Sequence, residues 1–458
     1  MAGTGKYQID MCNGPLLGKI IRFSLPLMAA NVMQLLFHAV GLVVLGRFTH
    51  GEAIAAVGAT SGLTVLILNI FLGLATGVNV LAARYIGAKD FARVSQTVHT
   101  AMAVSLYGGA VMGLVSLLIA KPMLLLMATP ENIIDKSSLY MWIYSIGVPA
   151  VILYNFGSAI LRAEGDTRRP LIFMVTAGVV NIMLNLFFVV LCKMDVAGVA
   201  LAAMIGSYVS AFLVMKALCN SSGSSKVVWS KIRFHWGVLK EMLKIGLPAG
   251  MQGAMFSISN ITIQSAVNSF GWQAIAGNTA ALSLEGIVYV ACSSYYYTAI
   301  SFVGQNHGAG KIDRIVKSVF YCALCTFVAG AFLGWGCFLF GNTLLGFYNS
   351  NPDVIQWGMI RLRIMFTVYF LCGWMDVVSG SLRGLGHSVK PMLVIMMGVC
   401  GLRVVWVFWV LPLRRSMETL FVSYPVSWIL VILINGAMLF YICRKMLRHS
   451  KRENALKH

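Results

Sequence analysis

The chain has 458 residues, of which 59% are hydrophobic and 11% are charged, and its mean hydropathy is +0.81. One soluble core cannot bury that much apolar surface, so the composition excludes a soluble globular protein and indicates an integral membrane protein. The net charge of +20 is typical of basic loops beside anionic lipid, and we do not expect nucleic-acid binding.

Apolar runs of about 20 residues or more recur along the chain, and each can cross the hydrocarbon core as a helix. They predict an all-α integral membrane protein with twelve transmembrane helices. The first run is long, which is typical of a retained helix rather than a cleaved signal peptide. The predicted spans are residues 20–46, 52–84, 94–120, 136–161, 170–193, 195–218, 242–268, 275–303, 315–341, 355–382, 390–413 and 416–443.

The basic residues predict the orientation. Most of the 35 lysines and arginines fall on one side of this arrangement, including those of residues 216–244 and 444–457. The positive-inside rule then places both termini in the cytoplasm of a multi-pass protein of the cell (inner) membrane.

Two stretches, "ILRAEGDTRRP" at 160–170 and "SLRGLGHSVKP" at 381–391, indicate an internal repeat. Arg162, Gly165 and Pro170 recur at one offset as Arg383, Gly386 and Pro391, which predicts two tandem six-helix lobes. The predicted domains are an N-lobe at 1–218, a cytoplasmic linker at 219–240, a C-lobe at 241–446 and a basic cytoplasmic tail at 447–458.

In this scheme the first of the repeated stretches is a loop between two helices. Its glycine permits a tight reversal and its proline suits the first turn of the next helix. We interpret the charges of Glu164, Asp166, Arg168 and Arg169 as a solvated, self-paired loop; the alternative is a catalytic cluster.

Several motifs, among them "LPLMAANVMQLLFHAVGLVVLGRF", "ARYIGAKD", "GSAILRAEGDTRRP", "GLPAGMQGAMFSISN" and "SFVGQNHGAG", resemble the MATE family of multidrug and toxic-compound extrusion transporters, prokaryotic branch. The resemblance implies two six-helix lobes that form a V-shaped cavity. It also implies a monomeric antiporter, without cofactor or catalytic residues, that exports small organic cations in exchange for H⁺ or Na⁺ by alternating access. Its other expected partner is membrane lipid.

Ion coupling needs an ionisable group inside the bilayer, where burial is costly and marks function. Of the 15 acidic residues, only Glu285 and Asp376 lie well within predicted spans. We predict that this pair couples transport by binding a proton or Na⁺. The alternative is that one of them only pairs with Arg403, interpreted as the one deep basic residue of its lobe.

Three carboxylates of the family pattern are missing from this chain. Many members carry an aspartate in helix one and another in helix five, and here these positions are Gly41 and Asn185. The glutamate that the sodium-coupled branch carries in helix seven is replaced by Phe256. The helix-ten aspartate, seven residues ahead of Arg383, is matched by Asp376.

Polar side chains at helical spacing predict the surfaces that line a substrate cavity. They can bind substrate or bridge helices through hydrogen bonds, and His38 is either a neutral hydrogen-bonded group or a proton carrier. The predicted residues are Asn31, Gln34, His38, Asn155, Asn181 and Asn185 in the N-lobe, and Gln252, Asn260, Gln264, Asn278, Tyr289 and Arg403 in the C-lobe.

Three other functions remain as alternatives. A flippase for lipid-linked oligosaccharide or other lipid would need several basic residues inside the cavity to hold its phosphates. A channel would need a filter repeat, and an enzyme a nucleophile–base or metal motif, and the sequence shows neither.

Overall fold

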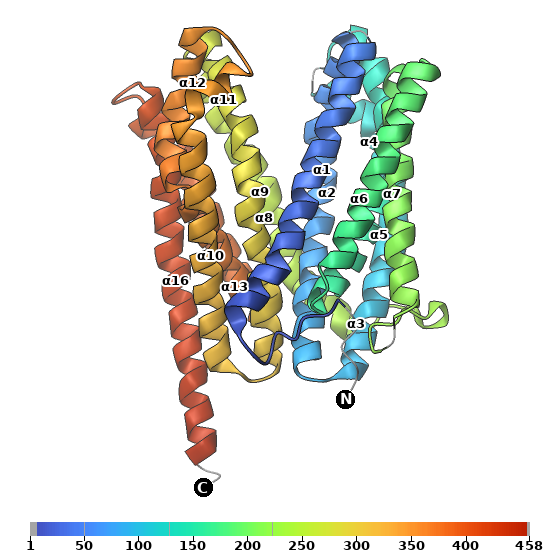
Figure 1. The fold of residues 1–458 in the computed structure, drawn as a ribbon, viewed down its shortest axis with the longest axis vertical. Helices are drawn as coiled ribbons and strands as arrows, with labels where there is room; N and C mark the ends of the chain where they lie inside the picture. Colours follow the sequence, from blue (N-terminus) through green and yellow to red (C-terminus); the bar gives the residue numbers. More distant parts are fainter. Residues whose placement is uncertain (1–6, 50, 128, 222, 456–458) are drawn as a thin grey trace. The chain divides into compact units, whose positions relative to one another are not determined.

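The computed structural model describes residues 7–49, 51–127, 129–221 and 223–455, and within these ranges the chain is helical with no β-strand (Figure 1). Short π-helical or 3₁₀ segments, labelled η, interrupt several helices. The elements are α1 (Leu16–Phe48), α2 (Gly51–Gly87), α3 (Phe91–Ala103), η1 (Val104–Gly108), α4 (Gly109–Leu126), α5 (Glu131–Ala163), α6 (Arg168–Asn185), η2 (Leu186–Leu191), α7 (Asp195–Cys219), η3 (Trp229–Lys231), α8 (Trp236–Asn268), α9 (Trp272–Gly308), α10 (Ile312–Leu339), α11 (Gly341–Gly346), α12 (Pro352–Met365), η4 (Phe366–Val368), α13 (Phe370–Gly384), α14 (Val389–Ile395), η5 (Met396–Gly401), α15 (Leu402–Val405), η6 (Trp406–Val410) and α16 (Met417–Ala455).

The predicted all-α membrane fold is confirmed. Among the described residues, ten helical spans are long and apolar enough to cross a membrane, and the pair α12 and α13 makes an eleventh. Helix α8, at the position of the predicted span 242–268, has 33 residues and is long enough to cross, but it is not among the helices that are also apolar enough.

The span predicted as one helix at 355–382 is bent by 48° between its two parts. The break lies at Tyr369, directly after η4, and the indole nitrogen of Trp335 donates a hydrogen bond of 2.9 Å to the carbonyl oxygen of Thr367 in η4. A side chain from α10 therefore satisfies backbone that the break frees, which sequence periodicity alone does not reveal.

The described chain divides into two compact units. The first comprises Met1–Asp10 and Ala29–Gly250, and the second comprises Met11–Met28 and Met251–His458. Both divisions inside helices fall just after a proline, Pro26 in α1 and Pro248 in α8. Proline removes one helical hydrogen bond, so a helix bends most easily near it. Both α1 and α8 therefore pass from one unit to the other at such a place.

In the first unit, α5 packs against α2, α4 and α7, and the beginning of α8 packs closely on α2. A Cβ atom added to Gly73 would lie 2.2 Å from the backbone nitrogen of Gly250 and 2.5 Å from the carbonyl oxygen of Gly246. Only glycine allows these two backbones to approach so closely.

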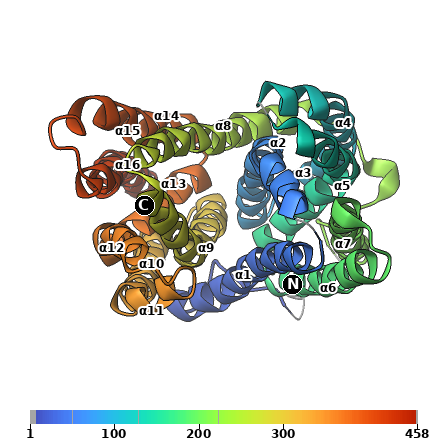
Figure 2. The ribbon, with the colours of Figure 1, turned by 90° about the horizontal axis from the view of Figure 1, so that it is seen from above.

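In the second unit, α9 packs against α10, α12 and α13, and α13 also packs against α16; Figure 2 shows α9, α10 and α12 together from above. The beginning of α1 belongs here, and the rings of Phe23 and Phe302 meet edge to face with centroids 5.6 Å apart. One core cluster of this unit includes Leu284, Val288, Met365, Phe366 and Phe421.

The repeated turns have the same backbone. Gly165 has φ of +92° and Gly386 has φ of +87°, both in the left-handed region that favours glycine. A Cβ atom at Gly165 would also lie 2.4 Å from the carbonyl oxygen of Ile9. The tight reversal predicted from the repeated phrase is confirmed in both halves.

Candidate functional site

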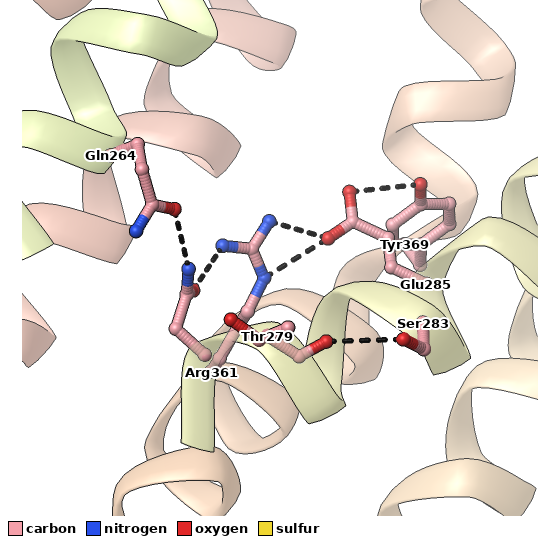
Figure 3. A network of polar contacts seen from close by, with 7 residues as sticks. Gln264, Thr279, Ser283, Glu285, Arg361 and Tyr369 are labelled. Atoms are coloured by element: carbon pink, nitrogen blue, oxygen red, sulfur yellow. Dashed lines mark hydrogen bonds and ion pairs between the residues drawn. The ribbon is translucent and has the colours of Figure 1, made fainter. Parts of the chain in front are cut away.

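Glu285 belongs to a hydrogen-bonded network in the second unit (Figure 3). Its Oε2 accepts hydrogen bonds from Arg361, at 3.0 Å from Nε and 2.5 Å from Nη2, and its Oε1 accepts one of 3.3 Å from the hydroxyl of Tyr369. The side chain of Arg361 is 2% exposed and that of Glu285 16% exposed. Both carboxylate oxygens of Glu285 are therefore engaged, and its charge is neutralised.

The network continues from the other side of the guanidinium. Nη1 of Arg361 donates a 2.7 Å hydrogen bond to Oδ1 of Asn278, whose Nδ2 donates one of 3.1 Å to Oε1 of Gln264. Gln264 in turn donates to Asn268, and the guanidinium carbon lies 5.0 Å from the ring centroid of Phe421. Side chains from α8, α9, α12 and α16 thus take part in this network.

Arg361 corrects two sequence-based statements. Glu285 pairs with Arg361 rather than with Arg403, and Arg403 is not the only deep basic residue, because Arg361 and Arg383 are equally buried. The sequence of α12 could have indicated that Arg361 is buried, because Arg361 lies on the same buried stripe as Val354 and Met365. Its position near the start of a predicted span concealed it.

Asp376, on α13, differs from Glu285 in having no counter-ion in contact. Within the described ranges no ion pair or hydrogen bond joins its partly buried carboxylate to another group. Tyr289, Cys372 and the guanidinium of Arg383 lie within electrostatic range of it, but none of them is in hydrogen-bond contact with it. An interior carboxylate without a direct partner is available to bind a proton, Na⁺ or a cationic group.

The remaining residues predicted for the second lobe divide into engaged and exposed groups. Gln252 accepts a 2.6 Å hydrogen bond from Nη2 of Arg383, whose Nη1 also donates to the hydroxyl of Tyr296. Asn260 and Tyr289 are exposed. Arg403 is 3% exposed, and its guanidinium carbon lies 3.8 Å from the ring centroid of Tyr424.

In the first unit, the two positions where the family pattern has aspartates are neighbours in space. A Cβ atom on Gly41 of α1 would lie 3.8 Å from Nδ2 of Asn185 on α6. That Nδ2 donates a 3.0 Å hydrogen bond to Oδ1 of Asn181, while Oδ1 of the buried Asn185 has no partner among the described residues. This unit therefore has two uncharged residues, a glycine and an amide, at the two neighbouring positions.

The other first-unit predictions lie apart from that pair of amides. Asn155 donates a 2.8 Å hydrogen bond to the carbonyl oxygen of Val151 in its own helix. Asn31 is half-buried and Gln34 is exposed. The side chain of His38 lies outside the described residues.

The loop between α5 and α6 is self-paired as predicted, but the prediction that it is solvated was wrong. Asp166 is fully buried and accepts hydrogen bonds from the backbone of Arg168 and Arg169 and from the Arg169 side chain. Glu164 accepts hydrogen bonds from Gln8 and Ser225. The N-terminal segment and the segment after α7 cover the loop. The sequence of the loop itself does not indicate that other segments bury it.

Burial raises the pKa of Glu164 from 4.5 to about 7, against the lowering effect of Arg169. The loop therefore holds a group that titrates near neutral pH. Among the described residues, no cluster of three or more His, Cys, Asp or Glu side chains could hold a metal ion.

Comparison with known sequences shows the family. The sequence model of the MatE family matches the chain twice, over residues 26–187 and 248–409. A probable multidrug resistance protein, YoeA of Bacillus subtilis, is 26% identical over 90% of this chain and 91% of its own length. An FAD transporter of Shewanella oneidensis is 22% identical, covering 88% of this chain and 89% of its own.

Solved structures show the same fold. A multidrug resistance MATE family transporter in the outward-facing conformation superimposes with a TM-score of 0.88 at 19% identity, covering 97% of this chain and 100% of that chain. A MATE structure in the bent conformation gives 0.89 at 18% identity, covering 96% and 98%. The family model, the relatives and the two-lobe fold agree, and this chain belongs to the MATE family of membrane transporters and is not an enzyme.

Proposed function

We propose that this protein exports organic cations in exchange for H⁺ or Na⁺ by alternating access, and that Asp376 carries the exchange. The observation that supports this most is the contrast between the two interior carboxylates: Glu285 is held by Arg361, whereas Asp376 has no ion-pair partner among the described residues. A carboxylate is costly to bury in its charged form. One that has no ion-pair partner is therefore suited to binding a cation that enters and leaves the site.

Exchange follows from competition for one negative charge. When the site faces the outside, H⁺ or Na⁺ binds Asp376 and displaces the organic cation. When it faces the cytoplasm, the organic cation displaces the small ion. Coupling requires that each ligand bind the two states with different affinity.

Glu285 has a different role in this proposal. Its carboxylate holds Arg361 and, through it, Asn278 and Gln264. We assign Glu285 to positioning the helices around Asp376, and it joins Asp376 in binding H⁺ or Na⁺ only in a state where Arg361 has withdrawn.

The amides of the first unit are proposed to line the substrate surface of that unit. Asn185 has an acceptor without a partner in the described structure, so it can accept a hydrogen bond from a ligand. Asn31 and Asn181 are half-buried on the same two helices, α1 and α6.

A lipid flippase is the second candidate, favoured by the three buried arginines of the second unit. Arg361 is engaged by Glu285, and Arg383 by Gln252 and Tyr296, which leaves only Arg403 for a lipid phosphate. We therefore rank it below cation export. We further propose a monomer in the cell (inner) membrane with both termini in the cytoplasm.

The test is uptake of tetramethylrhodamine methyl ester, a fluorescent organic cation, into liposomes that contain the purified protein. A proton gradient alone and a sodium gradient alone are applied in turn. Asp376→Asn should abolish gradient-driven uptake, and Asp353→Asn, which changes an exposed aspartate of α12, should retain it. Uptake by Asp376→Asn at the wild-type rate would overturn the assignment.

A further inference from the structure

Exposed aromatic rings occur in the segment from residue 226 to residue 240, which leads from α7 into α8 within the first unit. The exposed fractions are 64% for Trp229, 40% for Phe234 and 70% for Trp236. Most of this segment belongs to the predicted linker rather than to a membrane span. Large rings exposed in such a segment indicate an interaction surface for a partner with an apolar part.

The same segment is basic. Its exposed basic residues are Lys226, Lys231, Arg233 and Lys240. No acidic residue occurs between positions 226 and 240. Glu241, which comes next, is engaged, because it accepts a 3.0 Å hydrogen bond from the hydroxyl of Tyr85. A partner that matches this surface by charge is therefore anionic.

Two side chains of α3 hold the segment in place. Nε2 of His99, a residue 2% exposed, accepts a 3.1 Å hydrogen bond from the backbone nitrogen of Val228. The hydroxyl oxygen of Thr100 accepts one of 3.2 Å from the backbone nitrogen of His235. The rings and charges are thus carried on a backbone that is already ordered, which lowers the entropy cost of binding.

The two residues that hold the segment also indicate its depth. Helix α3 begins a candidate membrane span that runs from Phe91 to Leu126. His99 and Thr100 are the last residues before the run 101–120, which contains no charged or amide side chain. A change from polar to apolar sequence in a membrane span marks the level of the lipid headgroups, so the segment lies at that level.

A ring contact agrees with this depth. The ring centroids of Phe234 and Tyr107 are 5.8 Å apart. Tyr107 belongs to the apolar run and is 60% exposed, so the span presents it to lipid. Because helical side chains tilt toward the N-terminus of the helix, its ring lies closer to the level of Thr100 than its backbone does. Contact with a lipid-facing ring favours a lipid over a soluble protein as the partner of this surface.

We propose that the outer face of residues 226–240 binds the headgroups of anionic phospholipids. The basic side chains contact the phosphates, while Trp229, Phe234 and Trp236 lie at the boundary between headgroups and acyl chains. Since α8 begins at Trp236, lipid bound here also holds the start of that helix. The surface does not include the residues assigned to cation export and does not depend on that assignment.

Lipid binding to the purified, full-length protein in detergent is measured by native mass spectrometry. The anionic probe is dioleoylphosphatidylglycerol and the zwitterionic probe is dioleoylphosphatidylcholine. The wild type should bind the anionic lipid about tenfold more tightly or better. Lys231→Gln/Arg233→Gln should weaken that binding by about fivefold for each charge removed and leave phosphatidylcholine binding within about twofold.

Two further variants separate charge from other effects. Lys317→Gln/Lys445→Gln, which removes two exposed charges of the second unit, should leave the tightest phosphatidylglycerol binding unchanged. Lys231→Arg/Arg233→Lys keeps both charges and should bind as the wild type does. Trp229→Ala/Trp236→Ala should weaken both lipids alike, since the rings contact the part that the two lipids share.

Hydrogen exchange then locates the site. Phosphatidylglycerol should slow exchange of the backbone amides of residues 226–240 in the wild type and not in Lys231→Gln/Arg233→Gln. Protection confined to other residues would overturn the proposal. So would equal affinity of the wild type for the two lipids, or an equal loss in the control variant of the second unit. Glycerophosphoglycerol, the headgroup without acyl chains, should compete poorly, and competition as strong as that of the lipid would show a site for a soluble anion instead.

Discussion

Arg361 determines what Glu285 can do. A carboxylate that accepts two hydrogen bonds from a guanidinium 2% exposed is part of a buried ion pair, and breaking such a pair costs more than forming it contributes. Asp376 has no such partner in contact. The two acids that look equivalent in the sequence therefore differ in what holds them.

Glu285→Gln should destabilise the protein by about 3–5 kcal/mol, because it leaves the Arg361 charge buried and unpaired. The double variant Glu285→Gln/Arg361→Gln should recover much of that loss, since it removes both charges. Thermal unfolding in detergent measures this. Equal stability of the single variant and the wild type would show that the pair contributes nothing to the fold.

Glu164 gives a second prediction from a single side chain. Burial raises its pKa from 4.5 to about 7, so the folded chain binds this proton more tightly than the unfolded chain does. Stability therefore falls as pH rises from about 4.5 to about 7, and the destabilisation is complete above that range. Glu164→Gln should stabilise the protein at pH 8, by at most about 3 kcal/mol, and have little effect at pH 4.

Unfolding at the two pH values checks this, with Asp313→Asn, a change to an exposed aspartate, as the control. A gain for Glu164→Gln that is the same at both pH values would contradict a titration origin.

Among the helices, α1 and α8 connect the two units through their own length. Each begins in one unit and ends in the other, and the division follows Pro26 or Pro248. The beginning of α8 is held to α2 through contacts that only glycine permits. The contact between α8 and α2 is thus made by backbone atoms rather than by large side chains.

Gly73→Ala should lower the unfolding temperature, because its Cβ would lie 2.2 Å from the backbone of Gly250. We expect a cost of about 1–3 kcal/mol, as for overpacking. Gly58→Ala, in the same helix, meets nothing within 4 Å and should be neutral or stabilising by up to about 1 kcal/mol. Equal effects of the two changes would refute the close contact.

The elements could be predicted from the sequence to differing extents. Long apolar runs predict helices well, and the repeated Gly165 and Gly386 predict the turns, whose φ values agree. The bend after η4 was missed because Trp335, from another helix, satisfies the freed carbonyl. The pairing of Glu285 was missed because its partner Arg361 lies on a different helix, although Arg361 belongs to the buried stripe of α12.

Across the whole molecule, one six-helix sequence pattern occurs twice, and the family model matches each copy. The copies differ in charge. In the described first unit the positions near Gly41 and Asn185 are neutral, whereas the second unit buries Glu285, Arg361 and Arg403. The sequence identifies Glu285 and Asp376 as interior acids, but it does not reveal the buried arginines around them.

Cation export as proposed requires that a proton or Na⁺ and an organic cation compete for Asp376. Competition is measured as release of the bound ion when tetramethylrhodamine methyl ester is added to purified protein, followed with a pH indicator and with radioactive sodium. We expect the wild type to release about one ion per protein and Asp376→Asn to release none. Undiminished release by Asp376→Asn would show that the two cations do not compete at this carboxylate.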